Sequence, residues 1–545
     1  MIRWIGIFLL VSTSALGQVI EGKIVDAETG KPVPFASVGV VGTARGTSSN
    51  IDGEFSLFVS GDASIKITCI GYASTVVNSL GELAVIQLKP IATQLTEIVI
   101  YDKEINPRKI VRKAFASVAD NFDTKPFSQT FFYRHYCKDD DEYGRLIEAS
   151  VDVWKHKGYG SVQSSAGEKE EIRVTQLRRS LDKTAAAQGH TPIAIKSILH
   201  ADMAAYQSAV KTEHLSFFHD VNNLKTDFDQ YFFRFGGVTY YDGQEVYVIN
   251  FRYKEDSLLT TSGYIPAARS EGSLYITTDT HAFVKTEETK YQHLDTVRTS
   301  AYYRKYNDKY FPYHLTRVGK SQATDRSTHW FHIELMSVEI KPGDVNKFTG
   351  NEPSKEELLK IPYDSVFWVN NTTLKTTPLE DDIINDLGGG HSLNEQFQLY
   401  KEYERNLADG GIDGEQKFNW LRDFSRGNRI LYVGFWGSDC RPYLAELEHV
   451  KRLNQQYKGE ITFVLLSLEN DELKWRQAME KYNLFADGII HYRIGDHSDL
   501  ARRYKLKEIP SYILLSRNGD AVSDFAKHPT DAQLQADFGQ LLSQE

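Results

Sequence analysis

Between Phe127 and about Ile340, apolar and polar residues alternate with a period of two in one segment after another, as in QEVYVINFRY and THWFHIELMSVEI. Successive side chains of a β-strand point to opposite faces of a sheet. Such alternation is therefore typical of antiparallel strands with one buried and one solvated face. We predict that residues 91–345 form a central, mostly antiparallel β domain with helical insertions.

The chain of 545 residues is too long for one hydrophobic core, so several domains are expected. Its 63 basic and 73 acidic residues give a net charge of -10, which does not support binding to nucleic acid. The glycine run at 388–390 is not followed by lysine and serine or threonine, so it does not predict a phosphate-binding loop. No cofactor is expected.

Residues 1–17 have the pattern of an export signal. Arg3 is followed by an apolar run and then by Ala15-Leu16-Gly17, a small-residue cleavage site. The apolar run is too short to span a bilayer, and Gln18 stands where a lipoprotein would carry cysteine. We expect an exported protein, most simply in the periplasm, soluble or peripheral to the outer membrane.

Helices are predicted around the central strands. Apolar residues of 106–122 fall on one helical face, with Asn106-Pro107 as the start. Residues 161–209, rich in Ser, Ala, Lys and Glu, are expected to carry helices or a mobile excursion. Residues 346–425 read as a helical connector, in which Phe418, Trp420, Leu421 and Phe424 pack against the last domain.

Two groups of residues in the central domain have the composition of metal sites. On a strand, His329 and His332 point to opposite faces, so only His332 and Glu334 can meet, and a surface polar pair is the simpler interpretation. The acidic run 139–142 lies between strands and reads as a solvated loop. No metal site is predicted.

Residues 18–90 contain short alternating strands separated by turn sequences, which predicts a small all-β sandwich. This segment resembles the carboxypeptidase-regulatory-like domain of exported Bacteroidetes proteins, an accessory module without catalytic activity. The resemblance rests on Gly22, Ala36-Ser37-Val38, Gly46-Thr47, Asn50-Ile51-Asp52-Gly53-Glu54-Phe55 and Ile70-Gly71-Tyr72. The region behind it resembles an uncharacterised Bacteroidetes domain. Its later hairpins resemble periplasmic lipoprotein carriers, which implies an apolar concave face for a lipid or partner.

From residue 426 to 545 the pattern changes to strands that alternate with helices, which predicts an α/β domain. The strand RILYVGFW precedes the turn GSDC and a helix from Pro442 to about Tyr457. The fold class is therefore multidomain, with a β-sandwich, an antiparallel β domain and a C-terminal α/β domain.

The C-terminal segment resembles the thioredoxin superfamily, and within it the exported TlpA/ResA-like disulfide reductases. The resemblance is carried by Phe435-Trp436-Gly437, Cys440-Arg441-Pro442, Glu446 and Ile509-Pro510-Ser511. It implies that Cys440 attacks a disulfide at a helix N-terminus, where peptide dipoles favour the thiolate. Arg441 would add to this effect and Asp439 would oppose it. The resemblance also implies that Pro510 is a cis-proline, and that the Ile509 backbone pairs with a bound extended peptide.

The sequence departs from that family at two positions. Tyr443 stands where the resolving cysteine of a C-x-x-C pair is expected, and Gly434 stands where thioredoxins carry a buried acid. Cys69 and Cys137 are the only other cysteines, and they lie in other predicted domains. A single thiol can form a mixed disulfide but cannot release it without a second thiol.

Three functions are compatible with these residues. The first is a degenerate thioredoxin-like domain that binds extended segments of protein partners at Trp436, Asp439–Tyr443 and Ile509-Pro510, in the cell envelope and beside an outer-membrane partner. The second is a monothiol redox protein that uses Cys440 for mixed disulfides or oxidant sensing. The third is a lipid or protein carrier acting through the central β domain.

Overall fold

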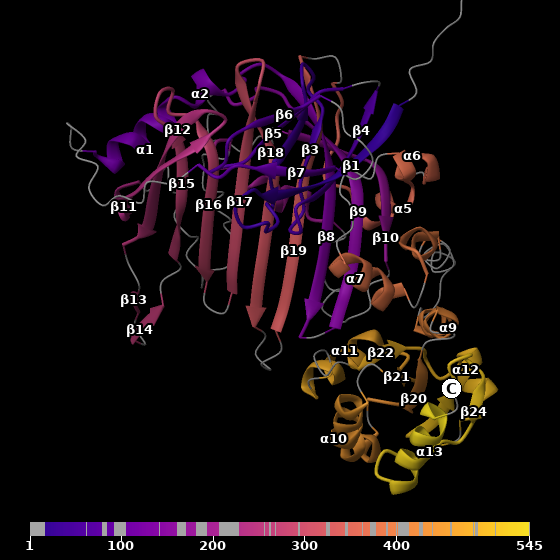
Figure 1. Ribbon diagram of the computed structural model, residues 1–545. Helices are drawn as coiled ribbons and strands as arrows, with labels where there is room; N and C mark the ends of the chain where they lie inside the picture. The colour runs from indigo at the N-terminus through magenta and orange to yellow at the C-terminus, as the bar shows by residue number, and fades with distance from the viewer. Residues whose placement is uncertain are drawn as a thin grey trace, which may run out of the picture.

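The computed structural model describes most of the chain (Figure 1). The described residues are 17–60, 63–78, 84–91, 105–140, 142–160, 170–180, 193–205, 228–254, 257–260, 263–266, 269–292, 295–322, 328–343, 347–361, 363–370, 378–388, 391–398, 401, 414–424, 429–438, 440–457, 460–482, 484, 489–506 and 508–543. The predicted export signal, except Gly17, lies outside them, as do residues 92–104 and all of 206–227.

The N-terminal unit is a β-sandwich of two small sheets, as predicted. One sheet has the order β4-β1-β7 and the other the order β3-β2-β5-β6. Ile24, Val38 and Phe55 are fully buried between them. The strands are β1 (Gly17–Asp26), β2 (Ser37–Val40), β3 (Gly46–Ser48), β4 (Glu54–Ser60), β5 (Ile65–Thr68), β6 (Thr75–Val77) and β7 (Ala84–Leu88).

The middle of the chain forms one ten-stranded antiparallel sheet, in the order β10-β9-β8-β19-β18-β17-β16-β15-β12-β11. The long two-residue alternation therefore predicted this sheet correctly. Its strands are β8 (Phe127–Asp139), β9 (Glu142–Lys155), β10 (Glu170–Arg179), β11 (Tyr231–Tyr241), β12 (Gln244–Tyr253), β15 (Arg269–Thr277), β16 (Phe283–Gln292), β17 (Asp295–Tyr306), β18 (Lys309–Gln322) and β19 (Thr328–Pro342). The small hairpin of β13 (Ser257–Thr260) and β14 (Gly263–Pro266) stands apart from it.

Two local expectations for the central domain have different outcomes. The predicted helix begins where expected, as α1 (Pro107–Ala116), because the Asn106 side chain accepts a hydrogen bond from the Lys109 backbone N–H, but α1 ends before Ser117 and does not continue to residue 122. The expectation of helices or a mobile excursion over 161–209 is wrong for residues 170–179, which form the edge strand β10. The other short helices are α2 (Val118–Asn121), α4 (Ile195–Leu199) and the 3-10 helix η1 (Phe228–Gln230).

The N-terminal sandwich packs on one face of the large sheet, at the end near the β17–β18 turn. The Ser48 hydroxyl lies 3.1 Å from Nδ1 of His314, and the Tyr313 hydroxyl donates to the Phe35 carbonyl at 3.0 Å. The Phe35 ring also packs 5.9 Å from the ring of Tyr302. These contacts fix the sandwich against strands β17 and β18.

Connector helices cover another part of the sheet. Ile383 and Leu387 of α7 (Pro378–Gly388) pack on Tyr136 and Leu146 of β8 and β9, and Figure 1 shows α7 in front of these strands. Helix α5 is Lys355–Leu359, α6 is Ser365–Asn370 and α9 is Gly414–Phe424, and residues 393–398 are also helical. Phe418 and Leu421 of α9 pack against the C-terminal unit as predicted, whereas the side chains of Trp420 and Phe424 lie outside the described residues.

The C-terminal unit is an α/β fold with the sheet order β22-β21-β20-β23-β24. The sheet separates two apolar clusters, one around Trp436 and Leu447 and one around Phe435 and Phe418. Its strands are β20 (Ile430–Trp436), β21 (Ile461–Ser467), β22 (Ile490–Arg493), β23 (Ser511–Leu515) and β24 (Ala521–Ser523). Its helices are α10 (Arg441–Gln456), α11 (Glu472–Lys481), α12 (Asp499–Arg503) and α13 (Ala532–Leu542).

Among the helices of the described residues, none combines the length and the apolar character needed to cross a membrane.

Candidate functional site

Cys440 lies where the buried central strand β20 passes into helix α10. All seven residues of β20 are buried, and β20 pairs with β21 on one side and β23 on the other. Cys440 is the N-cap residue of α10, and its backbone N–H donates to the Gly437 carbonyl at 3.0 Å. Its side chain makes no cap hydrogen bond, so the sulfur is available for other contacts.

The sulfur of Cys440 contacts the backbone that precedes β23. Its Sγ donates to the carbonyl oxygen of Ile509 at 3.4 Å, and Cys440 is 8% exposed. The Ile509–Pro510 peptide bond is cis. The fold thus brings together three of the predicted site residues, Cys440, Ile509 and Pro510, from segments that are 69 residues apart.

The remaining predicted site residues are placed differently. Trp436 is fully buried and belongs to the same apolar cluster as Cys440, so its packing fixes the start of the loop that leads to Cys440. Arg441, Pro442 and Tyr443 form the first turn of α10, but their side chains lie outside the described residues, as does all of Asp439.

Gly434 is explained by the packing of Tyr512. These two residues are directly opposite each other on β20 and β23. A Cβ at position 434 would lie 2.7 Å from the Tyr512 ring and 2.8 Å from a Leu465 methyl group. The resemblance implies a buried acid at this position in thioredoxins proper. In this chain the space beside Gly434 is filled by the Tyr512 ring.

Glu446 on α10 contacts two groups that the sequence did not reveal. The Tyr512 hydroxyl donates to one carboxylate oxygen of Glu446 at 2.8 Å, and Nδ1 of His528 lies 2.8 Å from the other. Tyr512 also stacks on Tyr432, with ring centroids 5.1 Å apart. Tyr512 and His528 are 66 and 82 residues from Glu446, and no motif links them, so only the fold shows this group.

The loop also carries a second polar contact. The Ser438 hydroxyl donates to the carboxylate of Glu469, which follows β21. The Cβ that Gly437 lacks would lie 3.1 Å from the Ile509 side chain. The loop before Cys440 is therefore held both to the end of β21 and to the segment that carries Pro510.

The other two cysteines lie in other parts of the fold, and all three are free thiols. Cys69 follows strand β5 and packs half-buried at the edge of the sandwich core. Burial raises the pKa of its thiol to about 12, although Lys285 acts in the opposite direction. Cys137 is fully buried in β8.

The histidines of β19 form pairs with acidic residues. Nε2 of His332 lies 2.5 Å from Glu334, as the alternation predicted, and Nδ1 of His329 lies 2.6 Å from Asp139. The expectation of a surface pair is wrong for Glu334, which is buried and also lies 3.9 Å from His314. Although burial alone would raise it, the pKa of Glu334 is lowered to about 2 because His332 and His314 stabilise the carboxylate.

Known proteins resemble the two ends of the chain. The family described as CarboxypepD_reg-like domain matches residues 20–100, and the family described as Thioredoxin-like matches residues 427–521. The thiol-disulfide oxidoreductase ResA of Halalkalibacterium halodurans is 23% identical over 158 residues, which cover 27% of this chain and 87% of the relative. The ResA protein of Bacillus cereus is 21% identical over 148 residues, or 27% of this chain and 80% of the relative.

A solved thiol-disulfide oxidoreductase from Bacteroides fragilis is 28% identical to this chain. It covers 20% of this chain and 81% of its own, with a TM-score of 0.18. The family matches account for the two ends of the chain. The chain therefore carries an N-terminal carboxypeptidase-regulatory-like domain and a C-terminal thioredoxin-like domain of the kind found in thiol-disulfide oxidoreductases.

Proposed function

We propose that the thioredoxin-like domain binds extended segments of partner proteins beside Cys440, with little or no turnover as a disulfide reductase. The observation that carries this proposal is the hydrogen bond from Cys440 Sγ to the Ile509 carbonyl, in a site where position 443 is tyrosine. The thiol and the backbone that would receive a peptide are in contact. The second thiol that would complete a reductase is missing from the motif.

The hydrogen bond has a consequence for binding. It exists only while the sulfur keeps its proton, and it occupies the carbonyl that an extended peptide would use to continue the sheet. A partner N–H that approaches the Ile509 carbonyl would share this oxygen with the thiol or compete with it. Peptide binding would therefore change the surroundings of the Cys440 sulfur.

The chemistry of one thiol limits what can follow. The Cys440 thiolate can attack a partner disulfide, form a bond to one sulfur and release the other as a thiolate. Breaking that mixed disulfide needs a further thiol. Cys137 is fully buried in the central sheet, and the pKa of Cys69 is raised to about 12. A thiol from another molecule would have to supply the second step.

A monothiol redox protein is the second candidate, and the position of Cys440 favours it. The residue caps a 16-residue helix, whose N-terminal dipole favours an anion at that point. In this case Cys440 would form a persistent mixed disulfide or respond to oxidants.

Reduction of insulin by the purified full-length chain, with dithiothreitol as electron source, tests the proposal. Wild type and Cys440→Ser are expected to give the same background rate, and Tyr443→Cys is expected to gain turnover because it restores a resolving thiol. Cys137→Ser serves as the control for loss of a thiol elsewhere. A wild-type rate that disappears in Cys440→Ser would overturn the proposal.

Trapping in cells separates the two candidates. Rapid alkylation followed by non-reducing electrophoresis should show no Cys440-dependent adduct if binding alone is the function. Partners cross-linked by a reducible bond in wild type but not in Cys440→Ser would instead establish the monothiol function.

Export to the periplasm is part of the proposal, supported by the pattern of residues 1–17 and by the similarity to ResA proteins. Cell fractionation with N-terminal sequencing of the mature chain tests it, and a mature chain that still begins at Met1 would count against it. A carrier function of the central domain would need an apolar face. The groove on one face of that domain is lined by three phenylalanines together with arginines, glutamates and other polar side chains, so it is not a purely apolar face.

A further inference from the structure

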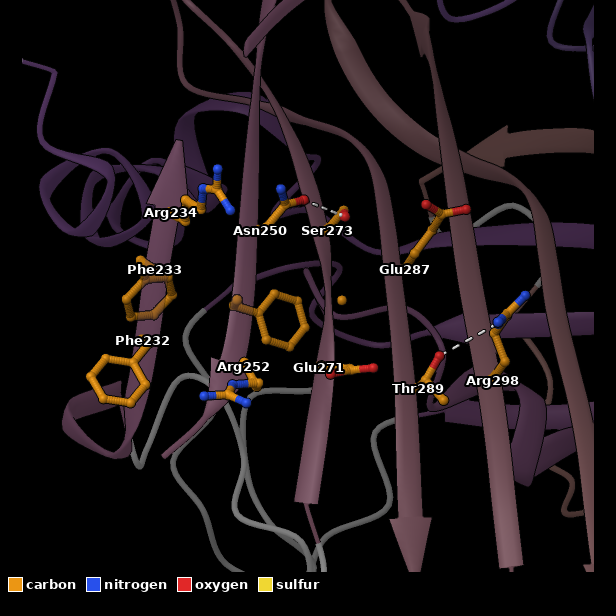
Figure 2. A pocket seen from close by; sticks show the side chains of 12 residues that line it. Phe232, Phe233, Arg234, Asn250, Arg252, Glu271, Ser273, Glu287, Thr289 and Arg298 are labelled. Atoms are coloured by element: carbon orange, nitrogen blue, oxygen red, sulfur yellow. Dashed lines mark hydrogen bonds between the residues drawn. The ribbon is translucent and has the colours of Figure 1, made fainter. Parts of the chain in front are cut away.

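One face of the central sheet carries a groove of about 680 Å³ that the thioredoxin-like site does not use, and Figure 2 shows the side chains that line it. The groove crosses strands β11, β12, β15, β16 and β17. Strand register arranges its side chains in two rows across the sheet. The first row is Phe232, Arg252, Glu271, Thr289 and Arg298, and the second is Arg234, Asn250, Ser273 and Glu287.

The groove lies beside stretches of the same sheet face that other parts of the chain occupy. Tyr302 lies on the same face of β17 as Arg298, four residues along the strand, and its ring packs on Phe35 of the sandwich. The row of Arg298 continues through Val318 and His332 to Tyr136, which α7 covers. Two neighbouring stretches of this face therefore already bind other parts of the chain.

The charges in the groove favour an anionic ligand. Arg234, Arg252 and Arg298 are exposed, whereas the two carboxylates, Glu271 and Glu287, are half-buried. The Tyr291 hydroxyl donates to Glu271 at 2.9 Å, and Lys285 pairs with Glu287 at 2.7 Å. Both acidic groups are thus already engaged.

Two of the arginines are available. Within the described part of the chain, neither Arg234 nor Arg252 has a hydrogen-bond or ion-pair partner. Arg298 makes one long contact, from Nε to the Thr289 hydroxyl at 3.4 Å. The Asn250 side chain accepts from Ser273 at 2.8 Å, which leaves its amide hydrogens for a ligand.

The spacing of the arginines matches an extended peptide better than a single small anion. Arg252 and Arg298 share a row and are three strand spacings apart, which is about 14 Å. Side chains on one face of an extended chain recur about every 6.8 Å, so carboxylates at positions i and i+4 span the same distance. Arg234 lies one strand beyond Arg252 and in the other row, within reach of a further carboxylate.

We infer that this groove, defined by Arg234, Arg252 and Arg298, binds an extended acidic segment of a partner protein. Each guanidinium group pairs with a carboxylate through two parallel N–H donors. Phe232, which is 55% exposed at the edge strand β11, packs against an apolar side chain of the same segment. This surface is independent of Cys440 and does not rest on the proposed function.

Fluorescence anisotropy of the full-length chain with a labelled (Glu-Ser)5 peptide tests the inference, and a (Gln-Ser)5 peptide of the same length is the ligand control. The double variant Arg234→Gln/Arg252→Gln should weaken binding at least about tenfold, and Arg298→Gln about threefold. Arg476→Gln, which removes an exposed ion-paired arginine of α11, should leave binding unchanged, as should Cys440→Ser.

A charge reversal keeps the test decisive if neutral variants lose stability. The variant Arg234→Glu/Arg252→Glu should no longer bind the (Glu-Ser)5 peptide and should instead bind a (Lys-Ser)5 peptide. Equal binding of the glutamate and glutamine peptides, or unchanged affinity in the double variant, would overturn the inference. Tighter arginine-dependent binding to polygalacturonate or to phosphatidylglycerol vesicles than to the peptide would also overturn it, since the ligand would then be a glycan or a membrane.

Discussion

The ring of Tyr512 packs directly against the backbone of Gly434, so that a Cβ at position 434 would lie 2.7 Å from it. The same ring carries the hydroxyl that reaches Glu446. The Tyr512 side chain therefore fills the space beside Gly434 and also supplies the hydroxyl that pairs with Glu446.

Replacement of Gly434 by alanine is expected to destabilise the thioredoxin-like domain by about 1–3 kcal/mol, because a methyl group must displace Tyr512 or Leu465 in a closely packed core. The thermal transition of this domain, followed by tryptophan fluorescence, measures the effect. Gly539→Ala is the matched control. Gly539 lies within α13 with open space around it, so the same substitution should stabilise by about 1 kcal/mol. Equal effects of the two substitutions would contradict this packing argument.

Glu446→Gln should destabilise the same domain by about 1–3 kcal/mol, since the carboxylate is the acceptor for Tyr512 and the partner of His528. Tyr512→Phe removes one of these bonds and should cost about 1 kcal/mol. Glu448→Gln, on the exposed side of the same helix, should change stability by less than about 0.5 kcal/mol. Urea unfolding of the three variants gives the comparison, and a Glu446 effect no larger than that of Glu448 would refute the assignment.

Stability is expected to fall as the pH decreases from about 6.5 to about 4, through His314 at the contact between sandwich and sheet. Burial lowers the pKa of His314 to about 4. The nearby His332 also lowers this pKa, whereas the Glu334 carboxylate raises it. The unfolded chain takes up the proton near pH 6.5, whereas the folded chain resists it. The contribution of His314 to the free energy of unfolding is therefore fully present above pH 6.5, and it is smaller by about 3 kcal/mol at pH 4.

The test for His314 is thermal unfolding as a function of pH. His314→Gln keeps a polar group that can meet Ser48 but cannot be protonated, so its profile should be flatter between pH 6.5 and 4. His497→Gln replaces an exposed histidine, with 91% of its side chain accessible, and should retain the wild-type slope. A slope that is the same in both variants would show that His314 does not carry the effect.

The central sheet contains a buried ionic group whose loss should be costly. Glu148 accepts from Arg134 at 2.7 Å and pairs with Arg178 at 2.6 Å, and the Glu148 and Arg134 side chains are fully buried. Burial tends to raise the pKa of Glu148, but Arg178 and Arg134 outweigh this and lower it. Glu148→Gln is expected to cost about 3–5 kcal/mol, because two arginines lose their counter-charge.

Glu472→Gln provides the comparison for Glu148. It breaks the exposed pair of Glu472 and Arg476 on α11 and should cost at most about 0.5 kcal/mol. Circular dichroism during urea unfolding of both variants distinguishes the cases. A loss below about 1 kcal/mol for Glu148→Gln would mean that the buried pairs do not stabilise the sheet.

Local signals in the sequence predicted the fold where each element depends on its own residues. The start of α1 follows from Asn106 and Pro107, and the Cys440 loop follows from a buried strand and a proline in the first helical turn. Strand β10 was missed because a bulge between Val174 and Gln176 interrupts the two-residue alternation, and charged residues occupy much of this edge strand.

The partners of site residues were less accessible to prediction. The contact of Cys440 with Ile509 was within reach because a family resemblance links the two segments. The contacts of Glu446 with Tyr512 and His528 depend on packing between β23, α10 and the segment before α13. No periodicity or motif within a single chain segment predicts contacts of this kind. The arginine groove is similar, because each arginine lies on a different strand and only the register places them on one face.

The order of strands in the central sheet has a consequence for how the chain is made. Strands β8, β9 and β10 form one meander and β11 to β19 another, and the two join only where β8 pairs with β19, whose facing residues include His329 and Asp139. During synthesis from the N-terminus, about 190 further residues must follow the β8 edge before its neighbouring strand exists. An unpaired edge is a template for incorrect association, so this interval is the period in which the nascent chain most needs a chaperone.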